Sequence, residues 1–79
     1  MSLPWWDRKI HTDRVAGWTY PCPECKRPAV ATGNLFHHRP PLTKWVVEYR
    51  CERCGDVFTI WAPETNDAVE TIVREEQRD

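Results

Sequence analysis

Two C-x-x-C pairs constrain this 79-residue chain more than any other feature of its sequence. The first pair, Cys22 and Cys25, lies in the stretch YPCPEC, and the second, Cys51 and Cys54, lies in YRCERCG. The chain has four cysteines in all, and 25 residues separate the two pairs. A chain of this length makes one domain with a small core, so a bound metal or a cross-link adds stability that packing alone does not supply.

This spacing predicts a four-cysteine metal site, with zinc as the favoured ion. A tight turn within each pair lets both sulfurs reach one ion, and Gly55, directly after the second pair, suits a position of positive φ in that turn. Four protein sulfurs occupy all four coordination positions of a tetrahedral zinc ion. No position is left for a substrate, which indicates a structural metal. Iron, a redox-active dithiol and a disulfide framework are the alternatives.

The start of the chain, MSLPWWDRKIH, lacks the apolar stretch of a signal peptide, and the longest apolar run is three residues. We therefore expect a cytoplasmic protein that does not cross a membrane, in a compartment where disulfides are rare. Ser2 is the one serine, there is no P-loop, and a chain of this size seldom encloses a pocket. These features predict that the protein is not an enzyme.

The sequence divides into three parts. Residues 1–17 are predicted to be an N-terminal extension without regular structure, 18–62 a metal-stapled β domain, and 63–79 a C-terminal amphipathic helix. Within the β domain, strands are predicted at 18–20, 29–32, 44–50 and 56–62, with a turn at Gly33-Asn34 and a loop over 35–43. The predicted fold is a small β domain of two cysteine-knuckle hairpins, with three or four antiparallel strands and one helix.

The predicted helix begins after Pro63, where Thr65 or Asn66 can cap it. Its apolar stripe is narrow, and Glu70 can pair with Arg74 one turn later. The stripe either docks on the chain's own sheet or pairs with a second copy, so we expect a monomer or a weak homodimer. It comprises Ala68, Val69, Ile72 and Val73.

The order of strands and cysteine pairs resembles a zinc ribbon, a rubredoxin-like four-cysteine zinc-binding domain. The stretch RPPLTKWVVEYRCERCGDVFTIW is similar to the second half of ribbons in transcription elongation factors and small RNA-polymerase subunits. The resemblance covers residues 18–62 and implies one structural zinc bound by Cys22, Cys25, Cys51 and Cys54. The elongation-factor ribbon carries an acidic pair at its hairpin tip for transcript cleavage, whereas the loop here reads HHRPP, so we do not expect that activity.

The net charge of −1 excludes a strongly basic nucleic-acid binder, so any such binding must use a local patch. Cationic and aromatic residues between 26 and 44 could form one, because cations hold phosphates and rings stack on bases. Our first hypothesis is a non-enzymatic zinc-ribbon module that acts on nucleic acid or on the nucleic-acid machinery. The candidate contact residues are Lys26, Arg27, Phe36, His37, His38, Arg39, Lys44, Trp5 and Trp6.

Three other interpretations remain open. The patch can be an ordinary solvated surface whose cations offset the charge of the thiolates. The chain can be a protein-interaction adaptor, or a small regulator or inhibitor, that uses Trp5, Trp6 and the helix. It can also be a rubredoxin-like electron carrier with iron in place of zinc. Bulk and strand position place the remaining tryptophans, Trp18, Trp45 and Trp61, in the core.

Overall fold

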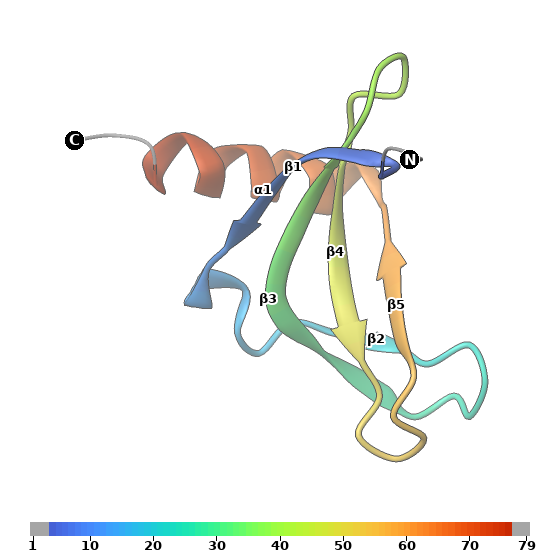
Figure 1. Cartoon of the computed structure of the whole chain (residues 1–79). Coiled ribbons are helices and arrows are strands. Elements are labelled where there is room, and N and C mark those ends of the chain that lie inside the picture. Colours follow the sequence, from blue (N-terminus) through green and yellow to red (C-terminus); the bar gives the residue numbers. More distant parts are fainter. Residues whose placement is uncertain (1–3, 77–79) are drawn as a thin grey trace.

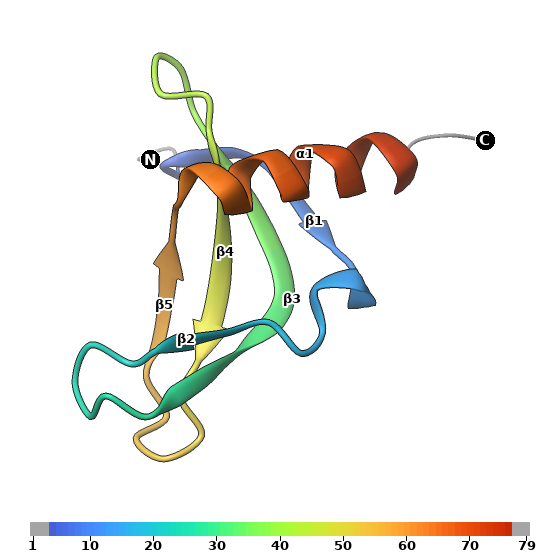
Figure 2. The same ribbon diagram turned by 180° about the vertical axis from the view of Figure 1, so that it is seen from behind.

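A computed structural model describes residues 4–76, which form one antiparallel sheet with a single helix across one face (Figures 1 and 2). The strand order is β1-β3-β4-β5, and the short β2 also pairs with β3. Every pairing is antiparallel. The elements are β1 (Trp6–His11), the 3-10 turn η1 (Asp13–Val15), β2 (Thr19–Pro21), β3 (Pro28–His38), β4 (Trp45–Arg50), β5 (Val57–Ile60) and α1 (Pro63–Glu76).

The long strand β3 is central to the sheet. Both β1 and β2 pair with one of its edges, and β4 pairs with the other. β2 pairs with residues 28–30 of β3, and β1 pairs with residues 34–38. Between them, the backbone N–H of Thr12 donates to the carbonyl of Gly33 (2.9 Å), and that of Ala31 donates to the carbonyl of Trp18 (3.0 Å). This edge of β3 is therefore hydrogen-bonded to the chain both before and after η1, the turn that connects β1 to β2. Val15 of η1 is fully buried in the core.

A bulge in the middle of β3 replaces the turn predicted at Gly33-Asn34. Ala31 pairs with Tyr49 and Leu35 with Val47, so β3 carries two more residues than β4 over this stretch. Gly33 has a φ of 99°, and a Cβ there would lie 2.9 Å from the carbonyl oxygen of Thr12. The turn signal of Gly-Asn thus bends a continuous strand instead of ending it.

The side chain of Glu48 stabilises this bulge from the neighbouring strand. Its Oε1 accepts hydrogen bonds from Oγ1 of Thr32 (2.9 Å) and Nδ2 of Asn34 (3.0 Å). The predicted loop over 35–43 is also shorter than expected, since β3 continues to His38. The consecutive prolines, Pro40 and Pro41, restrict the backbone only near themselves, so they do not end the strand at residue 35, where the loop was predicted to begin.

The segment expected to lack regular structure contains β1 and η1. Residues 6–11 pair with β3 even though they show no clear alternation of apolar and polar residues. An edge strand gains its hydrogen bonds from its neighbour, and this gain does not depend on its own pattern. Residues 1–3 of the predicted extension and 77–79 of the predicted helix lie outside the described residues.

The helix α1 docks on its own sheet through the predicted stripe. Val69, Ile72 and Val73 are buried and Ala68 is half-buried, and the closest strand is β4. The helix begins at Pro63, ahead of the expected caps; Asn66 instead accepts a hydrogen bond from the backbone N–H of Trp45 (2.8 Å). No helix among residues 4–76 is long and apolar enough to cross a membrane.

The last turn of α1 is attached to η1 by two polar contacts. Oγ1 of the buried Thr12 donates to Oε1 of Glu76 (2.7 Å), and Arg14 forms an ion pair with Glu75. The ion pairs among residues 4–76 do not include the expected one between Glu70 and Arg74, and Glu70 accepts a hydrogen bond from Nδ2 of Asn66 (3.3 Å). The chain therefore closes on itself, with the end of the helix against the start of the sheet.

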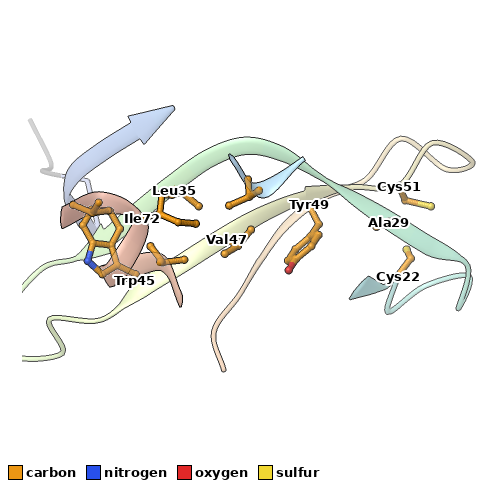
Figure 3. Close-up of a cluster of buried hydrophobic side chains, with 11 residues drawn as sticks. Cys22, Ala29, Leu35, Trp45, Val47, Tyr49, Cys51 and Ile72 are labelled. Atoms are coloured by element: carbon orange, nitrogen blue, oxygen red, sulfur yellow. The ribbon is translucent and has the colours of Figure 1, made fainter. Parts of the chain in front are cut away.

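The main core lies between α1 and the sheet and extends to the cysteines (Figure 3). Trp45 is 4% exposed and belongs to this core, and Trp18 packs against it, both as predicted. Trp61 was expected there too, but it is 42% exposed. Its neighbour Ile60, the last residue of β5, pairs with the core residue Val47, so continuing the strand alternation by one residue places Trp61 on the opposite face of the sheet.

Candidate metal centre

The four cysteine sulfurs meet at the end of the sheet farthest from α1, at the tips of the β2–β3 and β4–β5 hairpins (Figure 2). All four Sγ atoms lie within 4.8 Å of one another. The Sγ atoms of Cys25 and Cys51 are 3.4 Å apart, and those of Cys22 and Cys54 are 3.7 Å apart. Sulfurs at about 2.3 Å from a tetrahedral zinc would be about 3.8 Å apart. This cluster could therefore hold a metal ion.

The sheet register brings the two hairpin tips together. Pro21 pairs with Pro28 just outside the first cysteine pair, and Arg50 pairs with Val57 just outside the second. Val30 of β3 pairs with Arg50 of β4, which aligns one hairpin with the other. Cysteine pairs with 25 residues between them in sequence thus become neighbours through backbone pairing.

The two cysteine turns, or knuckles (residues 22–27 and 51–56), have the same hydrogen bonds. The backbone N–H of Cys22 donates to the carbonyl of Arg27 (2.8 Å), and that of Cys51 donates to the carbonyl of Asp56 (2.9 Å). In return, Lys26 donates to the carbonyl of Cys22 (2.9 Å), and Gly55 to that of Cys51 (2.7 Å). The two knuckles therefore have the same turn, and each turn directs both sulfurs of its cysteine pair toward the same point.

Both knuckles need a residue in the left-handed region. Gly55 has a φ of 77°, as its position after the second pair predicted. The equivalent residue of the first knuckle is Lys26, with a φ of 65°. A side chain costs about 1–2 kcal/mol in this region, so Lys26 carries strain that the sequence pattern did not indicate.

Backbone N–H groups give the sulfurs unequal acidity before any metal binds. The N–H of Cys54, together with hydrogen bonds from the neighbouring thiols, lowers the pKa of Cys51 to about 6 against the effect of burial. The N–H of Asp56 lowers the pKa of Cys54. The hydrogen bond between Cys54 and Cys51 and the burial of Cys54 have the larger combined effect and raise the pKa of Cys54 to about 12. The N–H of Arg27 likewise lowers the pKa of Cys25, but the hydrogen bond with Cys51 and burial together have a larger effect, so the pKa of Cys25 is raised.

These pKa values determine how many protons a metal ion would displace from these cysteines. Cys51 supplies a thiolate near neutral pH, while Cys25 and Cys54 keep their protons. A divalent metal stabilises thiolates and displaces such protons. Cys22 and Cys51 are fully buried, whereas Cys54 is exposed, so an ion could enter from the side of Cys54.

The structure separates the candidate contact residues into two groups. Lys26 and Arg27 lie at the knuckles, and the others lie at the opposite end of β3. This strand is eleven residues long. The strand rises about 3.3 Å per residue, so the groups are roughly 30 Å apart along it. The single surface expected over residues 26–44 is therefore not formed. The distant group comprises Phe36, His37, His38, Arg39, Lys44, Trp5 and Trp6.

Residues of the distant group also differ in the face they occupy. His37 lies on the helix side, with its ring 5.0 Å from that of Trp45 and its Nδ1 2.8 Å from Oδ1 of Asp7. Phe36 points to the opposite face, where the rings of Trp5 and Trp6 lie 5.5 and 5.6 Å from it. The alternation of side chains along a strand produces this division.

Lys9 and Trp61, which the sequence did not single out as contact residues, lie on the same face as Phe36. Nζ of Lys9 lies 5.7 Å from the ring of Phe36, and Nζ of Lys44 lies 4.6 Å from the ring of Trp61. Thr59, a polar residue two positions before Trp61, was the available signal that this side of β5 faces away from the core. Lys9 gave no signal because β1 itself was not predicted.

Comparisons of the chain with protein-family models, with curated proteins and with solved structures each found no match. The assignment of the four cysteines as candidate ligands therefore rests on their spacing and on the distances between their sulfurs.

Proposed function

We propose that the four cysteines bind one structural Zn²⁺ and that the chain is a zinc ribbon with an added N-terminal strand and C-terminal helix. The convergence of four sulfurs within 4.8 Å supports this proposal. Zinc accepts an all-sulfur tetrahedral site, and such sites in small domains are structural. Iron would suit the same donors and would make the protein an electron carrier, which a red colour would reveal.

The ribbon's function, in this proposal, is non-enzymatic binding of nucleic acid or of a protein of the nucleic-acid machinery in the cytoplasm. The single observation that carries it is the cluster of rings and lysines at the end of the sheet away from the metal. Trp5 and Trp61 are 43% and 42% exposed, and Lys44 lies over the ring of Trp61. Exposed rings beside cations suit bases and phosphates.

Binding of labelled oligonucleotides to the zinc-loaded chain tests this function. We expect fluorescence anisotropy to detect binding of single-stranded or duplex nucleic acid that weakens steeply with added salt, because each phosphate contact releases counterions. Absence of binding to both forms at low salt would contradict direct nucleic-acid binding.

A protein-interaction adaptor is the second candidate, and the exposure of Trp5 favours it. The helix is a poor anchor for such a partner, since its apolar residues Val69, Ile72 and Val73 are already buried against the sheet. A protein complex held by tryptophan would change little with salt, and this distinguishes the two functions.

A further inference from the structure

The face of the sheet opposite α1, here called the outer face, has an apolar cluster of its own. Figure 1 views the sheet from this side, with α1 behind the strands. Phe36 and Val46 pair across β3 and β4 and are 8% and 7% exposed, yet they are not part of the main core. Because α1 covers the other face, Phe36 owes its burial to side chains of the outer face, Trp5, Trp6 and Lys9.

Exposed indole rings lie on both sides of this cluster. Trp5 packs on Phe36 and His38 at one side, with ring centroids 5.5 Å away in each case. Continuing the β4–β5 register beyond Ile60 places Trp61 beside Val46 at the other. Two strand spacings, about 10 Å, separate the backbones of Trp61 and Phe36. The outer face thus presents two partly exposed rings, one toward each edge of the sheet.

Two lysines bring positive charge to the rings of this face. Lys9 and Lys44 contact rings, and within residues 4–76 the ion pairs involve other residues, Arg14 with Glu75 and His37 with Asp7. The carboxylate of Glu48 lies on the same face but at the bulge, where it accepts hydrogen bonds from Thr32 and Asn34. A ligand that approaches the rings therefore meets the ammonium groups of Lys9 and Lys44.

This combination favours single-stranded nucleic acid over a protein or a duplex. The buried parts of protein interfaces are depleted in lysine, whereas both cations over the outer rings are lysines. A duplex keeps the faces of its bases stacked inside, so it cannot use exposed rings as a platform. An unstacked strand offers both base faces for stacking and phosphates for Lys9 and Lys44.

We propose that the outer face binds single-stranded nucleic acid, with Trp61 and Trp5 stacking on bases and Lys9 and Lys44 contacting phosphates. This inference rests on the proposed function and narrows it to one class of nucleic acid and one face of the sheet. In the free protein Lys44 lies over Trp61; a phosphate draws the ammonium away and frees the ring for a base.

The test uses the zinc-loaded chain and fluorescein-labelled oligo-dT and oligo-U of about 12 nucleotides, a length within known site sizes. We expect Trp61→Ala and Lys44→Ala each to weaken binding of one or both strands at least about 5-fold, and Trp61→Phe to retain most of the affinity. Tyr20→Ala is the matched control, because Tyr20 is 40% exposed but packs on Tyr49 and Phe58 on the helix side. Metal content and circular dichroism verify that each variant is folded, and Lys44→Ala remains decisive if Trp61→Ala misfolds.

The outcomes separate this inference from the function on which it rests. Single-strand binding that survives both Trp61→Ala and Lys44→Ala, or that is lost in Arg27→Ala at the knuckles instead, would overturn the outer-face site and leave the proposed function intact. Binding of duplex alone would do the same. Failure of the wild-type chain to bind any nucleic acid would overturn both.

Discussion

Lys26 and Gly55 occupy equivalent positions in the two knuckles. Each follows the first cysteine of its pair by four positions, has a positive φ of 65° or 77°, and donates its N–H to that cysteine's carbonyl. The chain thus uses one turn twice, but only the second copy has the glycine that the turn favours.

This difference predicts opposite effects of substitution on the free energy of unfolding. Lys26→Gly should stabilise the metal-loaded protein by up to about 1 kcal/mol, and Gly55→Ala should destabilise it by about 1 kcal/mol. Gly33→Ala should cost more than Gly55→Ala, since its Cβ would meet backbone and Gly55 has open space around it. Urea denaturation measures all three, and equal costs for the two alanine variants would contradict the close approach at Gly33.

Removal of one sulfur should unfold the domain. Metal binding contributes about 10–16 kcal/mol to the folding of small zinc domains, far more than a core of this size supplies. We expect Cys51→Ser to lose both its metal and its cooperative melting transition. A variant that keeps both would show that the ion is not required for folding.

Metal affinity should depend steeply on pH. Cys25 and Cys54 are protonated at pH 7 in the free site, so binding should release at least two protons per ion. The lowered pKa of Cys51 keeps its thiolate down to about pH 6, below which a third proton competes with the metal. The stabilisation is therefore complete at high pH and lost as pH falls. Calorimetry in buffers of different ionisation enthalpy counts the protons, and a release below one would contradict this site.

The contact between Thr12 and Glu76 should stabilise the docked helix. Thr12→Val keeps the shape but removes the hydrogen bonds to Glu76 and to the N–H of Arg14, at a cost of about 1–2 kcal/mol. Thr12→Ser retains the hydroxyl and should cost less. Thermal melts of the two variants measure the difference, and indistinguishable midpoints would indicate that packing alone holds the end of α1.

The sequence predicted those parts of the fold that depend on local pattern. β4 alternates between Trp45, Val47 and Tyr49 on one face and Val46, Glu48 and Arg50 on the other, so its position was predictable. The helix stripe likewise identified the buried Val69. β1 was not predictable, because its partner β3 is more than twenty residues away and its own residues do not alternate. Gly33 indicated a turn by type, and only the contact with Thr12 shows why a bulge forms there.

The candidate metal site was predictable in its cysteines, and the contact surface was not. Spacing alone identified four sulfurs that meet in space. Lys26 and Lys44 are close enough in sequence to suggest one surface, but an eleven-residue strand lies between them. Trp61 was assigned to the core by its bulk, whereas its strand parity places it outside.

Native mass spectrometry with metal analysis of the same sample tests the central claim most directly. We predict one zinc per chain, bound by four thiolates, and its loss together with the fold when a chelator is added. Iron in the site would contradict the zinc assignment, and a metal-free chain four protons lighter than its reduced mass would replace the metal centre with two disulfides.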